Sequence, residues 1–302
     1  MGILFHPGDS RLLYIAFLGK KKMAQFMNPV ERLMLGHELC GSYSRDPDDP
    51  YNKNVTFGIE PVTSAERIRA YCARALWLRD ATRPSSPLPL LADNAWSPTE
   101  SLIAALISSP FVEFGYGIGP CVLNERISTP ENLSWTTEKS SRVPDILIAG
   151  TNIGLNYDGA VHLDLESVID AAINLERNPG MLASQEELDM VVRRVRAKAV
   201  DDIHRNRELV ANGYIVFPVV KEDLYQDGAL DFVMGQLMEA LEKYAHIDMT
   251  EQKRILKLPL ARARRQELIW SLMPGRNGQR TSSLVPRTAD AHERIIEVRI
   301  GL

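Results

Sequence analysis

The hydrophobic and polar positions of the chain follow helical spacing in some segments and form continuous apolar runs in others. Helical spacing predicts helices at residues 29–39, 63–78, 97–107, 163–174, 184–211 and 230–244. Short runs of apolar and β-branched residues predict strands at residues 12–18, 122–127, 146–149, 153–157 and 214–220. Because helices and strands alternate through the middle of the chain, we expect a mixed α/β fold.

Three of the predicted helices begin with a capping box, in which Ser or Thr is followed three residues later by Glu. The pairs are Thr63 with Glu66, Ser97 with Glu100 and Ser184 with Glu187. At the second pair, Pro98 also suits the first helical position. Closing the capping box is enough to account for Glu100, so this glutamate has a structural explanation beside any chemical one.

The apolar run at residues 214–220 is too continuous for a strand with one face in water. We expect it inside the sheet, because buried strands are apolar on both faces. Pro218 should lie near an edge or an end, since proline donates no ladder hydrogen bond.

The stretch from Arg142 to His162 holds the densest candidate chemistry. Two predicted strands, residues 146–149 and 153–157, are joined by a Gly/Asn turn and flanked by ionisable groups. If the strands are antiparallel, Asp145 before the first lies near Asp158 after the second. Two carboxylates and a histidine would then share one rim, which predicts a divalent-metal site. Asp145 at a strand end and Asp158-Gly159 in a turn are equally typical structural features.

Composition and charge narrow the function classes only a little. Apolar residues make up 45% and charged residues 25% of the 302 residues, as in an ordinary soluble globular protein. The formal charge of −4 excludes a uniformly basic nucleic-acid coat. The predicted long helix nevertheless carries a local basic stretch, which is a polyanion-binding face or simply a solvated face: Arg193, Arg194, Arg196, Lys198, Arg205 and Arg207.

The cysteines indicate neither a zinc site nor a disulfide framework. Cys40, Cys72 and Cys121 are odd in number, far apart and without Cys-x-x-Cys spacing, which favours the reducing cytoplasm. The apolar run at residues 12–18 is far shorter than the roughly 20 residues of a membrane helix. We therefore expect a cytoplasmic protein that has no membrane partner.

Four motifs stand in a fixed order between residues 97 and 216. They are Ser-Pro-Thr-Glu ending at Glu100, Arg-Val-Pro-Asp ending at Asp145, Asn-Tyr-Asp-Gly-x-x-His ending at His162, and Asp202-x-x-Arg205-x-Arg207 followed by Gly213-Tyr214-x-Val216. In this order they resemble the PD-(D/E)XK superfamily, in the branch of very-short-patch repair endonucleases. Residues 35–43 and Gly115-Tyr116-Gly117 also resemble AbiEi-associated bacterial proteins in which such a domain follows a short helical region. The resemblance implies a restriction-endonuclease-like core of helix, strand, strand, strand, helix and strand.

The resemblance also implies a metal-dependent endonuclease site that hydrolyses DNA. Asp145 matches the metal-ligating Asp, Glu100 matches the acidic residue that reaches the metal through water, and the Tyr157 carbonyl matches a backbone ligand. Glu100, Asp145, Asp158 and His162 would be the catalytic residues, with Mg²⁺ or Mn²⁺ as cofactor. Oxygen ligands of this kind suit Mg²⁺, and a histidine can transfer protons near neutral pH.

The chain departs from the superfamily pattern at three places. Asn156 stands where most relatives carry Glu, and Asp158 stands where most carry Lys, although the repair branch also lacks that Lys. Residues 163–198 form a longer insertion than the resemblance predicts. These departures leave a second function open, in which a catalytically impaired nuclease fold acts as a DNA-binding regulator or an antitoxin-like protein. Arg205 and Arg207 would contact nucleic acid in either case, or orient the acidic cluster.

The predicted domain organisation has three parts. Residues 1–90 form a mainly helical N-terminal region that ends in a proline-rich linker, and residues 91–248 form the restriction-endonuclease-like domain. Residues 249–302 form a basic C-terminal extension that we expect to be partly disordered. The sequence leaves open whether the protein is a monomer or a homodimer.

Overall fold

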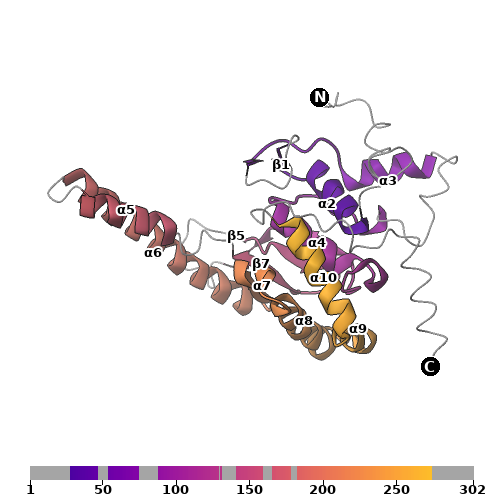
Figure 1. Cartoon of the computed structure of the whole chain (residues 1–302). Coiled ribbons are helices and arrows are strands. Elements are labelled where there is room, and N and C mark those ends of the chain that lie inside the picture. The colour runs from indigo at the N-terminus through magenta and orange to yellow at the C-terminus, as the bar shows by residue number, and fades with distance from the viewer. Residues whose placement is uncertain are drawn as a thin grey trace.

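The computed structural model describes residues 28–46, 54–74, 88–128, 130, 141–158, 165–177 and 182–273, and shows a mixed α/β protein (Figure 1). The helices are α2 (Pro29–Leu39), α3 (Ala65–Arg74), η2 (Leu88–Leu90), α4 (Pro98–Ser108), η3 (Phe111–Glu113), α5 (Leu165–Arg177), α6 (Leu182–Ala211), α7 (Lys221–Tyr225), α8 (Ala229–Ala245), α9 (Thr250–Leu256) and α10 (Pro259–Leu272). The strands are β1 (Tyr43–Arg45), β2 (Val55–Phe57), β3 (Cys121–Leu123), β4 (Ile127–Ser128), β5 (Ser141–Arg142), β6 (Ile146–Ile148), β7 (Ile153–Asp158) and β8 (Ile215–Val220).

The central sheet has the strand order β3-β6-β7-β8. β6 pairs antiparallel with both β3 and β7, while β7 pairs parallel with β8. The parallel pair requires a crossover, which α5 and α6 provide. In chain order, α4 is followed by three strands of this sheet, the α5–α6 crossover and the fourth strand. The antiparallel pairing predicted for residues 146–149 and 153–157 is therefore confirmed.

The expected interior position of the strand at residues 214–220 is wrong, because β8 is an edge strand of this sheet. Its apolar character has another cause, since α6 packs against one side of β8 and α8 against the other. Pro218 lies on this edge strand, as expected, where a missing ladder donor is tolerated.

The two faces of the sheet contact different cores. Ile146, Ile148, Ile153 and Leu155 point into the main core, which also contains the buried side chains of α4 and α8. Leu147 packs on the opposite face, in a small cluster with Leu209 of α6. Because side chains alternate along a strand, Asn156 and Asp158 lie on the α6 face, between residues that point into the main core.

The N-terminal and C-terminal helices share the main core with the sheet. Val30 and Leu33 of α2 are fully buried in the same cluster as Ile103 of α4. At the other end, the buried Arg265 of α10 pairs with Asp231 of α8 through bonds of 2.8 and 3.0 Å. The described residues on both sides of the middle region are thus packed onto it through side chains.

Several predicted element boundaries shift in the structure. α3 begins after Ser64, whose hydroxyl accepts from the Arg67 N–H, so the cap lies one residue beyond Thr63. α6 begins at Leu182, so the predicted Ser184–Glu187 capping box lies inside the helix and is wrong. The strand predicted at residues 122–127 is divided into β3 and β4 by Asn124, which has a φ of 49°. The strand predicted at residues 12–18, residues 75–78 of the predicted helix, and the segment from 274 onward lie outside the described residues.

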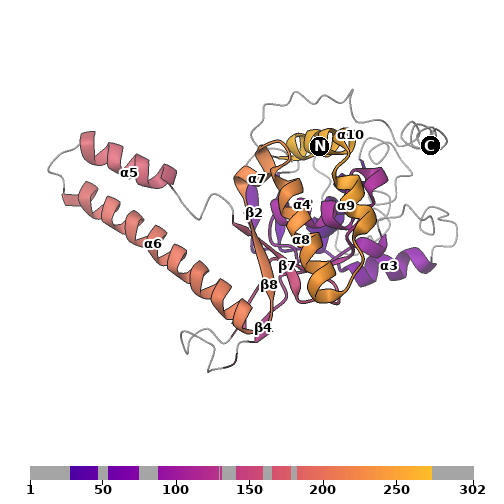
Figure 2. The same ribbon diagram turned by 90° about the horizontal axis from the view of Figure 1, so that it is seen from below.

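α5 and the N-terminal half of α6 extend away from the rest of the molecule as a pair of antiparallel helices (Figure 2). α6 is 30 residues long, and its C-terminal half returns to the body beside β5 and β8. Of the helices in the described ranges, none combines the length and the apolarity that a membrane span requires.

Candidate functional site

Three polar residues lie in one row across the central sheet, at the end where β6 begins. The ladder pairs Ile146 with Leu155, so the residues on either side of this pair, Asp145 and Asn156, lie opposite each other. On the far side of β6, the Asn124 N–H donates to the Asp145 carbonyl oxygen over 3.0 Å. Asp145 is thus the central residue of a row that runs from Asn124 to Asn156.

Reciprocal hydrogen bonds fix Asp145 to β7. The Asp145 N–H donates to Oδ1 of Asn156 over 3.1 Å, and Oδ2 of Asp145 accepts from the Tyr157 N–H over 2.6 Å. These bonds continue the β6–β7 pairing beyond the last backbone ladder position. The expected role of Asp145 at a strand end is confirmed, and it does not exclude a chemical role for the carboxylate.

The Asp145 carboxyl group has a strongly perturbed acidity. Burial is the main cause that raises its pKa from 3.8 to about 7, and the neighbouring Glu100 carboxylate and, to a smaller extent, Asp158 contribute to this rise. The Tyr157 N–H and the Arg205 guanidinium oppose this rise in pKa, but only in part. Glu100 and Asp158 therefore each lie near enough to Asp145 to affect its pKa.

Glu100 is buried at the start of α4, where its carboxylate accepts several hydrogen bonds. The donors are the Trp96 N–H, the Ser97 hydroxyl and Nδ2 of Asn124, each at 3.0 Å. The Ser97 Oγ in turn accepts from the Glu100 N–H over 3.2 Å, so Ser97 caps the helix as predicted. Burial raises the pKa of Glu100, against these hydrogen bonds. Through Asn124, the carboxylate is also connected to the Asp145 row.

Asp158, at the end of β7, forms an ion pair with α6. Nη2 of Arg205 lies 3.1 Å from Oδ1 of Asp158 and 3.5 Å from Oδ1 of Asp202, one turn earlier on the same helix. Arg205 therefore orients the acidic cluster, which is one of its two predicted roles. Arg207 is exposed on α6 and is accessible to a partner.

A second ion pair connects α6 to the strand that leads into the site. The Arg142 guanidinium binds Glu208 through two bonds, of 2.5 and 3.0 Å, and also contacts Asp201 at 3.2 Å. Arg142 and Glu208 are only 6% and 4% exposed. Arg142 stands three residues before Asp145, so the pair fixes the approach of the chain to β6.

His162 lies outside the described residues, so the structure gives no position for this predicted catalytic residue. Tyr157 lies in β7 opposite Val219 of β8, and its contribution to Asp145 is a backbone N–H. Among the residues that the structure does describe, no three His, Cys, Asp or Glu side chains are arranged to hold a metal ion. Glu100, Asp145 and Asp158 do not form such a group by themselves.

Two buried amide atoms at the site have no hydrogen-bond partner within the described part of the chain. They are Oδ1 of Asn124 and Nδ2 of Asn156, on side chains that are 3% and 1% exposed. A buried polar atom without a partner is costly unless water, an ion or a ligand satisfies it. The Asn124 oxygen suits a hard cation or water, whereas the Asn156 NH₂ group is a donor and suits an anion or water.

In chemistry alone, the carboxylate and amide oxygens at the site are of the kind that a hard divalent cation prefers, but the described side chains are not arranged as a metal-binding group. Asn156 does not fit as a ligand through Nδ2, and its Oδ1 already accepts from Asp145. Asn124 was not singled out from the sequence. Its signal is an asparagine directly after a strand, since Asn tolerates a positive φ better than most residues.

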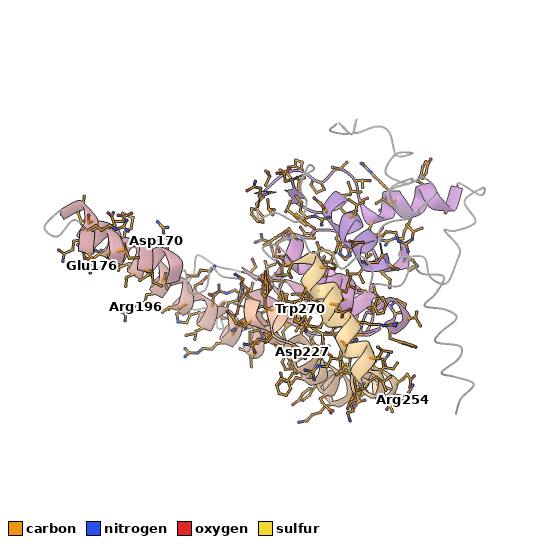
Figure 3. All side chains as sticks on the ribbon, in the orientation of Figure 1. Asp170, Glu176, Arg196, Asp227, Arg254 and Trp270 are labelled. Atoms are coloured by element: carbon orange, nitrogen blue, oxygen red, sulfur yellow. The ribbon has the colours of Figure 1, made fainter. Side chains whose placement is uncertain are left out.

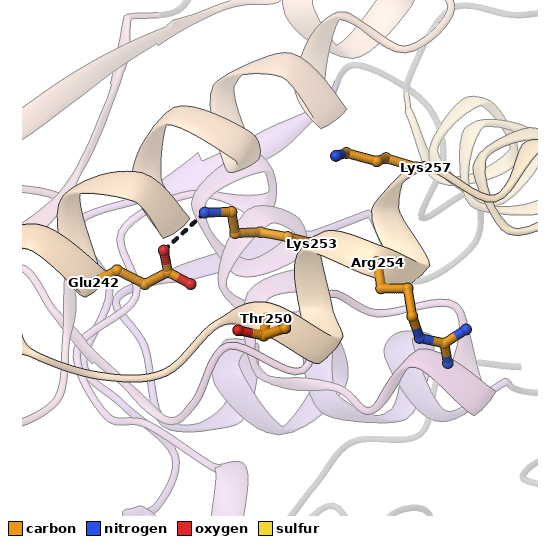
Figure 4. Close-up of a pocket in the computed structure, with 5 residues that line it drawn as sticks. All are labelled: Glu242, Thr250, Lys253, Arg254 and Lys257. Atoms are coloured by element: carbon orange, nitrogen blue, oxygen red, sulfur yellow. Dashed lines mark hydrogen bonds and ion pairs between the residues drawn. The ribbon is translucent and has the colours of Figure 1, made fainter.

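A separate pocket lies between α8 and α9, on a different part of the molecule (Figure 4). Its volume is about 490 Å³, and it is lined by Glu242, Thr250, Lys253, Arg254 and Lys257. Lys253 pairs with Glu239 and Glu242, and Arg254 pairs with Glu251. Most of the positive charge in this pocket is thus already neutralised, which makes it a weak anion site.

No protein-family model, no curated protein and no solved structure matches the chain.

Proposed function

We propose that the protein is a divalent-metal-dependent endonuclease of the PD-(D/E)XK type that hydrolyses phosphodiester bonds in DNA. The observation that carries the proposal is the environment of Asp145, whose carboxyl pKa is raised to about 7 beside Glu100 and Asp158. Strongly perturbed carboxylates that lie together are characteristic of functional sites. The order of α4, three sheet strands, the α6 crossover and β8 supports a restriction-endonuclease-like core.

Asp145 would hold Mg²⁺ or Mn²⁺ directly, Glu100 would do so through water, and the Tyr157 carbonyl is the proposed backbone ligand. The cation would supply charge stabilisation for the phosphoryl group. Tyr157 orients Asp145 through its N–H, and Arg205 orients Asp158. His162 remains the proposed group for moving protons, Asp158 a further catalytic carboxylate, and Arg207 a phosphate contact.

A second function is favoured by one specific observation. Asn156 presents an amide, not a carboxylate, at the position where relatives carry Glu, and its NH₂ group has no partner among the described residues. Such a site is weakened as a cation site and retains a donor for a phosphate oxygen. The alternative is thus a DNA-binding regulator or antitoxin-like protein with impaired cleavage.

The test is incubation of the full chain with supercoiled plasmid and Mg²⁺ or Mn²⁺, alongside the Asp145→Asn variant. Asparagine keeps an oxygen that can accept from the Tyr157 N–H, so this change removes charge with little change in shape. Asp227→Asn, an exposed carboxylate on the body (Figure 3), is the matched control. Cleavage by the wild type and by Asp227→Asn, without cleavage by Asp145→Asn, supports the endonuclease. Equal cleavage by all three proteins, or none, refutes it.

The outcome for DNA binding separates the two functions. A regulator would bind DNA in a salt-dependent manner without cleaving it, and Asp145→Asn would leave the binding intact. The partners we propose are DNA and a second copy of the chain. We also propose a cytoplasmic location, which the free buried thiols of Cys40 and Cys121 support.

A further inference from the structure

α5 and the first part of α6 form an arm, defined here as residues 165–177 and 182–198. Both views show these helices side by side and away from the body (Figures 1 and 2). Ala171 and Ser184 are buried where the two helices meet, and Nδ2 of Asn174 donates to Oε2 of Glu187 over 2.8 Å. The arm is therefore a defined two-helix unit with its own seam.

Several apolar side chains of the arm lie outside this seam and are exposed to solvent. Ile169 is 54% exposed, Met190 58% and Val192 45%, and Ile173 is also exposed one turn after Ile169. Val168, Ala171 and Leu175 of α5 are less exposed and lie in the seam with α6. Ile169 and Ile173 lie outside the seam, so the apolar stripe on α5 is wider than the part that contacts α6. A stripe this wide on a projecting helix pair is expected when the pair has further helical neighbours.

The charges on the arm portion of α6 form two blocks of opposite sign. The acidic block comprises Glu186, Glu187 and Asp189, and the basic block comprises Arg193, Arg194, Arg196 and Lys198. The centres of the blocks are about eight residues apart, which is roughly 12 Å along a helix. Met190 and Val192 lie between them, so the sign of the charge reverses across an exposed apolar centre.

We propose that the arms of two copies of this chain pack against each other, antiparallel and about a twofold axis near residues 190–192. A twofold axis there brings the acidic block of each α6 opposite the basic block of its partner, because a residue four positions before the centre meets one four positions after it. The same contact covers Met190, whereas Val192, two residues further on, points to another side of the helix. The two arms together form a four-helix assembly.

Charge complementarity favours a second copy over nucleic acid as the occupant of the arm. The two blocks contain four basic and three acidic residues, so a polyanion would gain little and would meet the acidic block within two helical turns. The pair Arg193–Asp189, at 3.9 Å, is highly exposed and is easily exchanged for pairs with a partner. Figure 3 shows Arg196 of α6 on this arm, away from Asp227 and Trp270 of the body.

The experiment measures the mass of the full chain by analytical ultracentrifugation at several concentrations. We expect a dimer for the wild type and a dissociation constant at least about tenfold higher for each of two charge variants. One variant is Arg193→Glu with Arg194→Glu and Arg196→Glu, and the other is Glu186→Lys with Glu187→Lys and Asp189→Lys. A mixture of the two variants should form a heterodimer, since the complementary charges are restored between chains.

Two further variants test the proposed contact and a surface away from it. Met190→Asp changes one exposed side chain and should also produce monomers, whereas Phe232→Asp, at an exposed apolar position on α8, should leave the dimer intact. Circular dichroism of each variant checks that the arm keeps its helices. A monomeric wild type, a dimer that all arm variants preserve, or a charge-variant mixture that stays monomeric would each overturn the proposal. Tighter DNA binding by the lysine variant of a monomeric protein would assign the arm to nucleic acid instead.

Discussion

Asp145→Asn should make the folded protein more stable at alkaline pH, although the side chain is hydrogen-bonded in the wild type. The pKa of Asp145 rises from 3.8 to about 7 on folding, so the folded state holds this proton more tightly than the unfolded state. Stability from such a group is complete below the unfolded pKa and is lost as the pH rises through the folded pKa. The wild type should therefore lose stability between about pH 4 and pH 7.

The size of the effect follows from the shift in pKa. Each pKa unit corresponds to about 1.4 kcal/mol, so a rise from 3.8 to about 7 costs about 4 kcal/mol once the carboxylate is ionised. Asparagine does not ionise, and its side-chain oxygen still accepts from the Tyr157 N–H. The difference in unfolding free energy between variant and wild type should thus grow from near zero at pH 4 to a few kcal/mol at pH 8.

Urea unfolding followed by circular dichroism, at pH steps from 4.5 to 8 with a chelator present, measures this difference. The control is Asp227→Asn, which changes an exposed carboxylate and should shift stability by less than about 0.5 kcal/mol at every pH. A variant that is less stable than the wild type at pH 8, or a difference that does not change with pH, would refute the reasoning. Addition of Mg²⁺ at pH 8 should stabilise the wild type more than Asp145→Asn if the site holds a cation.

Three further changes test neighbouring contacts. Arg142→Ala removes the guanidinium that binds the buried Glu208 carboxylate and should lower the unfolding free energy by about 3–5 kcal/mol, measured by urea unfolding; a loss below 1 kcal/mol would contradict this. Arg205→Met removes a cation that lowers the pKa of Asp145, so the pH at half-maximal metal binding should move upward; a downward move would count against it. Asn156→Glu adds a carboxylate beside Asp145 and should tighten Mn²⁺ binding about tenfold by calorimetry, and unchanged binding would argue against a cation there.

Local sequence signals correctly predicted the helices at which the capping residue and the apolar spacing indicate the same first residue. α2 and α4 begin where the sequence predicted, because Asn28 and Ser97 cap them through their own side chains. The cap predicted at Ser184 was wrong, because α6 already begins at Leu182. The interior position predicted for β8 was also wrong. Helices that pack on both faces of this strand account for its apolar run, and it has no neighbouring strand at one edge.

Strand pairing predicted Asp158 near Asp145 and the motif order predicted Glu100 there, and both carboxylates raise the pKa of Asp145. The ion pair between Asp158 and Arg205 joins residues 47 positions apart, and sequence spacing left it as one of two roles for Arg205. The contact from Asn124 to Glu100 was not predictable, because it depends on the backbone turning at Asn124 after β3. Side-chain contacts between distant elements are set by packing, which local patterns do not encode.

α6 is a single uninterrupted helix of 30 residues, roughly 45 Å long, with very different surroundings at its two ends. Its C-terminal half is anchored by Glu208 to Arg142 and by Arg205 to Asp158, whereas its N-terminal half contacts chiefly α5. The helix is therefore held against the body by its C-terminal half, and its other half projects. A sideways load on the projecting end is resisted by those two ion pairs and by the packing of Leu209 against Leu147, so Arg205, which contacts Asp158, also helps to hold the whole arm in its direction.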